Sequence, residues 1–163
     1  LRARADVIID TSELSVADLR DRVSGLFISG EDRPGLTITV LSFGFKFGLP
    51  PEADLVMDCR FLPNPHYDPA LRPRTGEEKE VRDYVLENPD GAEFIERLRG
   101  LLGFLVPRFV RERKSYLTIA VGCTGGRHRS VAVAGAVAEI LRDLGYEARL
   151  RHRDVARTPT GGA

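Results

Sequence analysis

The chain has 163 residues and equal numbers of basic and acidic side chains, 24 of each, so its formal net charge is zero. This length fits a single domain that can bury a core, and the balanced charge by itself favours no nucleic-acid partner. No apolar run is long enough to cross a bilayer, which argues against a membrane protein. Cys59 and Cys123 are the only cysteines, and without a signal peptide they are typical of reduced thiols in a cytoplasmic protein.

The first part of the chain predicts three strands and one helix. A short apolar strand is expected over residues 6–10, and a capping-box pattern at Ser15 opens a helix. Residues 36–43 form the clearest strand pattern because β-branched residues dominate them. Residues 55–58 predict a further short strand. The chain starts at Leu1 inside an apolar pattern and has no initiator Met, so we expect it to be part of a longer protein.

The middle of the chain predicts a loop and two helices. Four prolines lie between residues 60 and 76 and predict a long, stiff loop without regular structure. A capping box at Thr75 then opens a helix that runs towards Leu86. The next helix is expected to start at Asp90, and Pro107 should kink it or end its first part.

The last part of the chain predicts a strand, a helix and a second strand. The first strand is expected over residues 116–121, and the helix runs over 130–144 because Gly145 is a natural residue to follow a helix end. A final strand is expected over residues 146–150. The tail over 158–163 is expected to be disordered.

Predicted strands alternate with predicted helices along the chain. We therefore expect an α/β fold with a mostly parallel sheet flanked by helices, in a single Rossmann-like domain. Ligands of such sheets bind beyond the carboxyl ends of the strands. Three loops of unusual composition, over residues 42–48, 60–74 and 123–129, each follow a predicted strand. We expect them to meet in one cleft.

The most informative segment is the sequence Gly-Cys-Thr-Gly-Gly-Arg-His-Arg-Ser over residues 122–130. Its glycines let backbone N–H groups converge, and the N-terminus of the following helix adds about half a positive charge. Arg127, His128 and Arg129 crowd the same loop. The segment therefore predicts phosphate binding, with a glycine-rich turn around a buried structural cysteine as the alternative.

Cys123 and Arg129 also match the Cys-x5-Arg-Ser/Thr loop of cysteine-dependent phosphatases. In that chemistry the loop amides and the arginine hold phosphate oxygens while the cysteine thiolate attacks phosphorus. Only under this alternative would Cys123 and Arg129 be catalytic. Gly122 departs from the pattern, which usually has His before the nucleophile, and Asp58 and Asp68 are the available candidates for the general acid.

Polar side chains also lie in the loops after the other predicted strands. Asn64 and His66, on the proline-stiffened loop, are placed to contact a polar ligand, with Asp58 and Arg60 nearby. The alternative is that Asn64 and His66 are polar residues of a solvent-exposed loop that contact no ligand. Lys46 lies among three phenylalanines whose presence core packing explains, but core packing does not explain a lysine there. No two of the three histidines have a recognised metal-ligand spacing, so no metal site is predicted.

Four arginines near the C-terminus recur on a strand-like period, which would place several cations on one face. They are Arg149, Arg151, Arg153 and Arg157. Such a face suits a polyphosphate backbone, so these are candidate RNA-binding residues. The alternative is a solvent-exposed edge strand that is protected from further pairing by its charges.

Four segments together resemble the RapZ family, also described as the RNase adapter or YvcJ-like nucleotide-binding family. They are Ser42-Phe-Gly-Phe-Lys-Phe-Gly, Asp58-Cys-Arg-Phe-Leu-Pro-Asn-Pro-His-Tyr, Leu71-Arg-Pro-Arg-Thr-Gly and the segment over 122–130. Full members carry an N-terminal domain with a Walker-type nucleotide loop, and no G-x4-G-K-S/T is present here. The chain thus resembles the C-terminal domain alone, with residues 1–157 as the sugar-phosphate and RNA-binding domain.

The resemblance implies a regulatory domain that senses glucosamine-6-phosphate or a related sugar phosphate, binds small RNA and delivers it to a ribonuclease. It implies a cytoplasmic homo-oligomer, no cofactor in this domain, and ATP or GTP in the N-terminal domain. The residues expected around the sugar phosphate by resemblance are Asp58, Arg60, His66, Cys123, Thr124, Gly125, Gly126, His128, Arg129 and Ser130. Three further residues, Ser42, Lys46 and Asn64, are expected to contact the sugar phosphate because they lie in the loops after the predicted strands. A module for oligomerisation and protein interaction, with a purely structural loop, is a further alternative.

Overall fold

The computed structural model describes residues 7–12, 14, 19, 23 and 35–157. The chain divides into two compact units, residues 1–35 and residues 36–163. The second unit contains the strands and helices whose bounds are given below.

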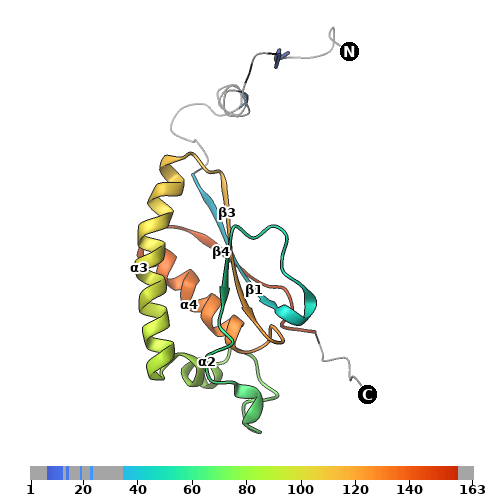
Figure 1. Ribbon diagram of the computed structural model, residues 1–163, viewed down its shortest axis with the longest axis vertical. Coiled ribbons are helices and arrows are strands. Elements are labelled where there is room, and N and C mark those ends of the chain that lie inside the picture. The colour runs from blue at the N-terminus through green and yellow to red at the C-terminus, as the bar shows by residue number, and fades with distance from the viewer. Residues whose placement is uncertain (1–6, 13, 15–18, 20–22, 24–34, 158–163) are drawn as a thin grey trace. The chain divides into compact units, whose positions relative to one another are not determined.

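Within residues 35–157, four strands form one parallel sheet in the order β2-β3-β1-β4. The strands are β1 (Thr37–Gly44), β2 (Leu55–Asp58), β3 (Tyr116–Cys123) and β4 (Ala148–His152). The register pairs Gly44 of β1 with Cys123 of β3, and Gly122 of β3 with Asp58 of β2. The carboxyl ends of these three strands therefore lie at one edge of the sheet (Figure 1). The predicted α/β fold with a parallel sheet is confirmed.

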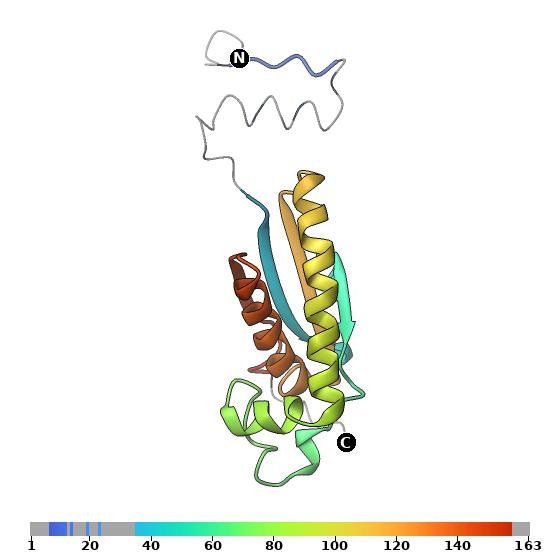
Figure 2. The same cartoon turned by 90° about the vertical axis from the view of Figure 1, so that its left-hand side faces the viewer.

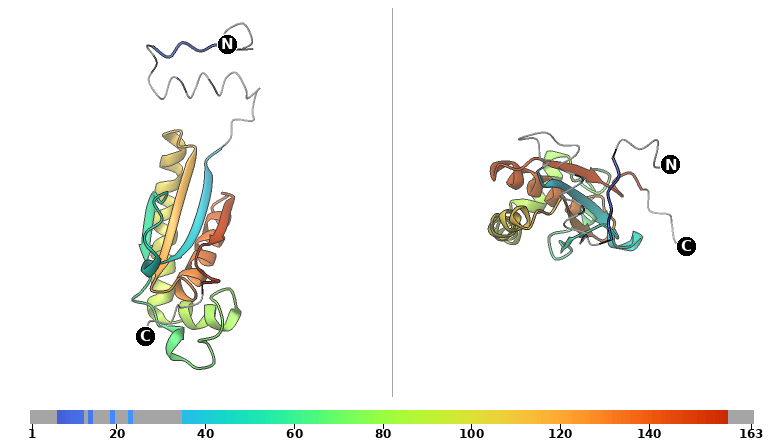
Figure 3. Two further views of the ribbon diagram at one scale, coloured as in Figure 1. Left: turned by 90° about the vertical axis from the view of Figure 1, so that its right-hand side faces the viewer. Right: turned by 90° about the horizontal axis from the view of Figure 1, so that it is seen from above.

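Three α-helices and two short 3₁₀ helices complete this described part. They are α2 (Lys79–Leu86), α3 (Pro89–Arg111), α4 (Arg129–Asp143), η2 (Phe45–Phe47) and η3 (Pro65–Tyr67). The α4 helix packs on β1, β3 and β4, while α2 and α3 pack against α4. Figures 2 and 3 show α3 and α4 on the same face of the sheet, with α2 beyond the carboxyl ends of the strands.

The core lies between this sheet face and the helices. Ile38 and Val40 of β1 are in register with Leu117 and Ile119 of β3, and all four side chains are buried in the same cluster. The α4 helix presents mainly alanine and valine to them, and most of its residues are buried. Short side chains let a helix approach a sheet closely. This packing fixes the N-terminus of α4 at the carboxyl edge of the sheet.

The strand bounds correct several predictions. The strand expected over 6–10 is wrong for residues 7–10, which have no regular structure. β3 continues past residue 121 to Cys123, because its ladder with β1 extends that far. β4 begins two residues later than expected, since the Tyr146 N–H still bonds the Leu141 carbonyl in the turn after α4.

The helix bounds differ from the predictions in a similar way. The α3 helix begins with Asn88 as its cap, whose side chain accepts the Gly91 N–H at 3.0 Å, and not with Asp90. It continues through Pro107 to Arg111. A 3₁₀ turn, η3, forms in the loop that was expected to have no regular structure, because Asn64 caps it.

Two other predictions fall at the edges of the described residues. Of the helix expected from Ser15, Leu19 and Val23 are described and are helical, and the rest lies almost wholly outside the described residues. The tail over 158–163 lies entirely outside them.

Candidate functional site

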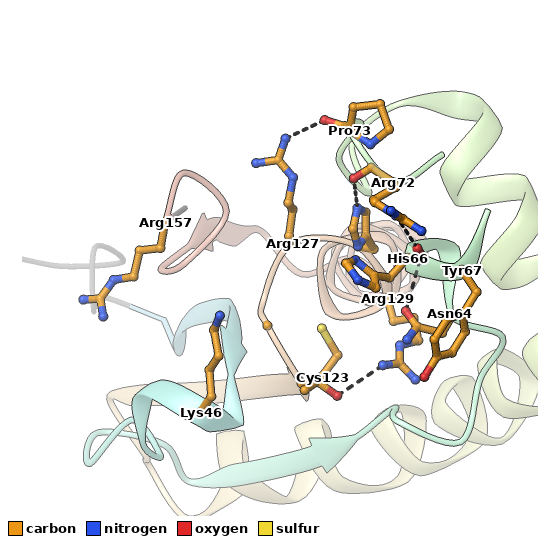
Figure 4. Close-up of a pocket in the computed structure, with 13 residues that line it drawn as sticks. Lys46, Asn64, His66, Tyr67, Arg72, Pro73, Cys123, Arg127, Arg129 and Arg157 are labelled. Atoms are coloured by element: carbon orange, nitrogen blue, oxygen red, sulfur yellow. Dashed lines mark hydrogen bonds between the residues drawn. The ribbon is translucent and has the colours of Figure 1, made fainter. Parts of the chain in front are cut away.

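A pocket of about 750 Å³ lies at the carboxyl edge of the sheet. The loops after β1, β2 and β3 and the segment after β4 all contribute to it, so the expected meeting of three loops is confirmed (Figure 4). The lining residues are Lys46, Asn64, His66, Tyr67, Arg72, Pro73, Cys123, Thr124, Gly125, Arg127, His128, Arg129 and Arg157. They include five lysine or arginine side chains, two histidines and no carboxylate, so the lining has the chemistry of an anion site.

The N-terminus of α4 borders this pocket through His128 and Arg129. His128 stands at the N-cap position and makes no side-chain cap bond. The first N–H groups of the helix therefore lack the side-chain acceptor that a serine or aspartate cap would supply. Thr124 and Gly125 line the pocket in the same loop. Such helix ends attract phosphate through their N–H groups and the helix dipole.

Cys123 lies beneath the loop. Its Sγ accepts the Gly126 N–H at 3.2 Å and lies 3.1 Å from the Ser130 Oγ, and the residue is only 3% exposed. Cys59, which directly follows β2, is fully buried and donates its thiol proton to the Gly122 carbonyl at 3.1 Å. Burial raises the pKa of the Cys59 thiol well above its ordinary value. Cys59 is therefore a structural thiol, whereas Cys123 borders the pocket.

Glycines allow the loops to pack backbone to backbone. Gly126 has φ +75°, and a Cβ there would lie 2.7 Å from the Gly44 nitrogen. At Gly122 the rings of Phe43 and Phe45 already fill the space, because a Cβ would lie 2.6 Å and 2.5 Å from their atoms. The histidine that precedes the nucleophile in cysteine-dependent phosphatases would not fit at residue 122 unless these rings moved.

Arg129 joins the glycine-rich loop to the proline-rich loop. It is only 5% exposed. Its guanidinium donates to the main-chain carbonyls of Arg60 and Leu62 and to the Thr124 Oγ1 at 3.3 Å. The arginine of the motif is therefore bonded to the protein itself, although it borders the pocket and adds its positive charge there.

Arg127 and His128 bind the same loop to the segment that precedes α2. Arg127 donates to three main-chain carbonyls, at 2.6 to 3.2 Å, which are those of Pro73, Arg74 and Val155. The His128 Nε2 lies 3.1 Å from the Arg72 carbonyl. Burial lowers the pKa of His128, so the neutral ring with its proton on Nε2 fits this contact.

Asn64 and His66 form the wall on the proline-rich loop. The Asn64 Oδ1 accepts the His66 N–H at 3.3 Å and so caps η3. Among the described residues, neither the Asn64 amide nitrogen nor the His66 ring makes a hydrogen bond, and both side chains border the pocket (Figure 4). These polar groups are available to a ligand.

Lys46 and Arg157 lie on the other side of the pocket in Figure 4. The Lys46 Nζ is 4.7 Å from the centre of the Phe47 ring, and the Arg157 Cζ is 4.8 Å from the same point. The Arg157 Nε pairs with the buried Asp154 carboxylate at 3.1 Å. The Lys46 N–H donates to the Thr124 carbonyl at 3.3 Å, but the Lys46 ammonium makes no hydrogen bond or ion pair within the part of the chain that the structure describes.

Five of the residues expected around the ligand do not line the pocket: Ser42, Asp58, Arg60, Gly126 and Ser130. Asp58 and Arg60 instead pair with each other at 2.6 Å. Hydrogen bonding from Arg60 holds the pKa of Asp58 below its ordinary value, which makes this carboxyl a poor general acid. The buried Ser42 hydroxyl is 2.8 Å from the His152 Nδ1, away from the pocket lining. The Gly126 N–H and the Ser130 hydroxyl instead contact the Cys123 Sγ, and these contacts stabilise the loop.

Of the four C-terminal arginines, two lie on a strand, so the predicted alternation holds for Arg149 and Arg151 and does not extend to Arg153 and Arg157. Arg149 and Arg151 lie on β4 and are exposed. Arg153 follows the strand and bonds the buried Asp154 at 2.8 Å, and Arg157 reaches the pocket. The strand period ends at His152, so the alternation cannot continue beyond it.

Four lining residues were not in the predicted set: Tyr67, Arg72, Pro73 and Arg127. Each lies in one of the segments that carry the family resemblance. The available signal was their position in a loop after a strand, and their residue types alone did not identify them.

Two further observations bear on the chemistry of the site. Within residues 7–12, 14, 19, 23 and 35–157, no group of three or more His, Cys, Asp or Glu side chains is arranged to hold a metal ion. None of the helices in those residues is both long and apolar enough to span a membrane.

Comparison with known proteins shows the family to which this chain belongs. Residues 36–156 match the RapZ C-terminal domain. Similar relatives, each named nucleotide-binding protein, include those of Desulforudis audaxviator (50% identical, covering 99% of this chain and 55% of the relative) and Trichlorobacter lovleyi (52% identical, 96% and 55%). A third, from Rubrobacter xylanophilus, is 55% identical over 95% of this chain and 52% of its own length. The chain spans about half the length of the curated relatives it matches. Because the family match covers most of the sequence, the chain belongs to the RapZ C-terminal domain family.

Proposed function

We propose that this domain is a regulatory domain that binds a phosphorylated sugar without cleaving it, with glucosamine-6-phosphate as the first candidate. One observation carries the proposal: the N-terminus of α4, which has no side-chain cap bond, borders a pocket lined by five cationic side chains and no carboxylate. A phosphate placed there would accept from the helix N–H groups and would be attracted by the lining charges. Membership of the RapZ C-terminal domain family supports the same class of ligand.

Cleavage of the phosphate is the second candidate, and the geometry argues against it. Arg129 is committed to carbonyl groups of the proline-rich loop. Asp58 is paired with Arg60 and lies outside the lining. The nucleophile therefore lacks both a free arginine and a placed general acid.

The whole protein would have further functions. We infer that ATP or GTP binds in a part of the longer protein that this chain does not cover, since the longer relatives are named nucleotide-binding proteins. Small RNA would be a second partner, and a ribonuclease a third, in a cytoplasmic homo-oligomer. Arg149 and Arg151 support an RNA contact because both are exposed on an edge strand. A gel-shift titration at rising salt tests this, since phosphate contacts predict binding that weakens steeply.

Calorimetry tests the metabolite site. We expect glucosamine-6-phosphate to bind and glucosamine, which lacks the phosphate, to give no heat. The His66→Ala variant should bind about tenfold more weakly because it removes a free polar group of the wall. Arg142→Ala, an exposed change on α4 far along the helix, is the matched control.

Two results would contradict the proposal. One is a null titration with protein that circular dichroism shows to be folded. The other is phosphomonoesterase turnover that disappears in the Cys123→Ser variant, which would establish the phosphatase.

A further inference from the structure

We infer that Cys59 and Cys123 form a reversible disulfide when the chain is exposed to hydrogen peroxide, and that this bond weakens phosphate binding at the glycine-rich loop. The two thiols lie at the ends of neighbouring strands, and they are the only cysteines of the chain. The effect on binding rests on the proposed function, because it acts on the phosphate site assigned there. The formation of the disulfide needs no ligand.

The backbone sets the two cysteines opposite each other. The register pairs Asp58 of β2 with Gly122 of β3, and the Cys59 N–H still donates to the Gly122 carbonyl at 2.9 Å. The next position along both strands therefore places Cys59 opposite Cys123. Neighbouring strands lie about 4.8 Å apart, and the Cα atoms of a disulfide are usually about 4.4–6.8 Å apart. The backbone spacing suits a disulfide.

The two side chains also point to the same face of the sheet. Successive residues of a strand point to opposite faces, so Cys59 and Cys123 lie on the face opposite to that of Asp58 and Gly122. Both cysteines belong to the single buried cluster that the sheet forms with the helices. The Cys59 Sγ lies 3.1 Å from the Gly122 carbonyl oxygen, which directly precedes Cys123 in the chain. The two thiols are therefore neighbours in the core.

The pocket gives an oxidant access to one of the two thiols. Cys123 lines this cavity of about 750 Å³, whereas Cys59 is fully buried and does not line it (Figure 4). The Gly126 N–H and the Ser130 hydroxyl contact the Cys123 Sγ, and they could also donate to an oxygen atom added to this sulfur. Burial raises the pKa of Cys59, which keeps that thiol protonated. Cys123 is thus the thiol that peroxide oxidises first.

The chemistry takes two reactions. The Cys123 sulfur attacks one oxygen of hydrogen peroxide, the O–O bond breaks, and the thiol proton passes to the leaving oxygen, which gives a sulfenic acid and water. The Cys59 sulfur then attacks the Cys123 sulfur, the S–O bond breaks, and the leaving hydroxide takes the Cys59 proton as a second water. Two thiols are oxidised and one peroxide is reduced. A dithiol such as dithiothreitol restores both thiols by exchange.

The disulfide removes contacts that hold the glycine-rich loop. To bond Cys59, the Cys123 Sγ has to turn away from Gly126 and Ser130, which it contacts in the reduced protein. The Cys59 thiol likewise gives up its hydrogen bond to the Gly122 carbonyl. Gly126 lies in the loop, and Ser130 lies in the first turn of α4. The loop and the helix N-terminus therefore lose part of the preorganisation that favours phosphate binding.

Mass spectrometry under non-reducing conditions tests the disulfide. We expect the folded 163-residue chain to lose two hydrogens after treatment with hydrogen peroxide, to show no free thiol on denaturation, and to regain both thiols with dithiothreitol. In Cys59→Ser, whose hydroxyl can still donate to the Gly122 carbonyl, oxidation of Cys123 should stop at a sulfenic acid that dimedone traps. Cys59→Ala should behave in the same way. In Cys123→Ser, Cys59 should remain a free thiol. Circular dichroism checks that each variant is folded.

Calorimetry with glucosamine-6-phosphate tests the effect on the loop. We expect the oxidised chain to bind about tenfold or more weakly than the reduced chain, and dithiothreitol to restore the affinity. Untreated Cys59→Ser should bind within about threefold of the reduced chain, because Cys59 does not line the pocket. Linkage requires the reciprocal effect. In a dithiothreitol redox buffer, saturating glucosamine-6-phosphate should shift the equilibrium towards the two thiols by the same factor.

Three outcomes would overturn the inference. The first is that both thiols remain free after peroxide treatment of folded protein. The second is that disulfides form only between chains, which a non-reducing gel shows as dimers. The third is that the oxidised and reduced chains bind glucosamine-6-phosphate equally. If the disulfide forms within the chain but neither form binds any sugar phosphate, the proposed function fails and the effect on binding fails with it, whereas the disulfide site stands.

Discussion

Two pairs of cations surround the same pocket and differ in what they bond. Arg127 and Arg129 belong to the conspicuous glycine-rich motif, yet their guanidinium groups donate to carbonyls of neighbouring loops. Lys46 and Arg157 lie in less conspicuous segments, and they keep donors available at the pocket. The difference teaches that an arginine in a phosphate-loop pattern can hold the loop together while cations from other segments face the ligand.

Substitution of Arg129 should have the largest effect. We expect Arg129→Ala to lower the free energy of unfolding by about 3 kcal/mol, because two carbonyls of the proline-rich loop lose a buried charged donor. Urea unfolding followed by circular dichroism measures this. Arg142→Ala, exposed near the end of the same helix, should change stability by less than about 0.5 kcal/mol. If Arg129→Ala lowers the free energy of unfolding no more than Arg142→Ala does, Arg129 does not stabilise the fold and the contrast between the two pairs of cations is wrong.

Gly126→Ala should have the next largest effect. Its φ of +75° disfavours a side chain, and the added Cβ would press on the Gly44 nitrogen, so we expect a loss of about 2 kcal/mol. Gly125→Ala is the matched control, because a Cβ there meets nothing within 4 Å. If both variants unfold at the same urea concentration, the close packing of the two loops does not stabilise the protein.

A smaller effect is expected from pH. Burial lowers the pKa of His128 and of His152 below the ordinary value of 6.5. The unfolded state then binds protons more readily than the folded state, so stability should rise with pH up to about 6.5 and fall below it. The charged groups near these rings are Arg127 beside His128 and Glu77 beside His152. Urea midpoints between pH 5 and 8 measure this, and His128→Gln should flatten the slope. A slope that is unchanged in this variant would show that His128 is not responsible.

Lys46→Ala should have the smallest effect on stability. The side chain is exposed and packs only against Phe47, so we expect a change within about 0.5 kcal/mol. The same variant should nevertheless weaken binding of glucosamine-6-phosphate by about tenfold, because Lys46 lines the pocket. A matched pair of measurements, unfolding and calorimetry, would therefore sharpen the contrast with Arg129. A large stability loss in Lys46→Ala would show that Lys46 stabilises the fold as Arg129 does, and it would contradict the contrast between the two pairs of cations.

The sequence predicted the fold class and the position of the site through local patterns. β-branched runs identified β1, and the glycine-rich segment between β3 and α4 indicated where the pocket lies. The convergence of three loops followed from the rule that parallel strands end at one edge.

The bonding of individual side chains could not be predicted in this way. That Arg129 reaches the Leu62 carbonyl, and that Asp154 anchors Arg157, depends on contacts between segments far apart in the chain. The same holds for Asp58 and Ser42, which were expected at the ligand and are bonded elsewhere. Residue type and spacing report which donors exist, whereas tertiary packing decides which of them remain free.

The strand order also has a consequence for how the domain is made. β1 pairs with β3 and β4 and not with β2, its neighbour in sequence. During synthesis β1 has no partner until β3 has left the ribosome, and β4, which precedes the segment that carries Arg157, comes last. Long-range parallel pairing of this kind folds slowly. A chain that is interrupted before β4 would hold the glycine-rich loop and Lys46 but not Arg157, so the pocket lining is completed only after β4 has been made.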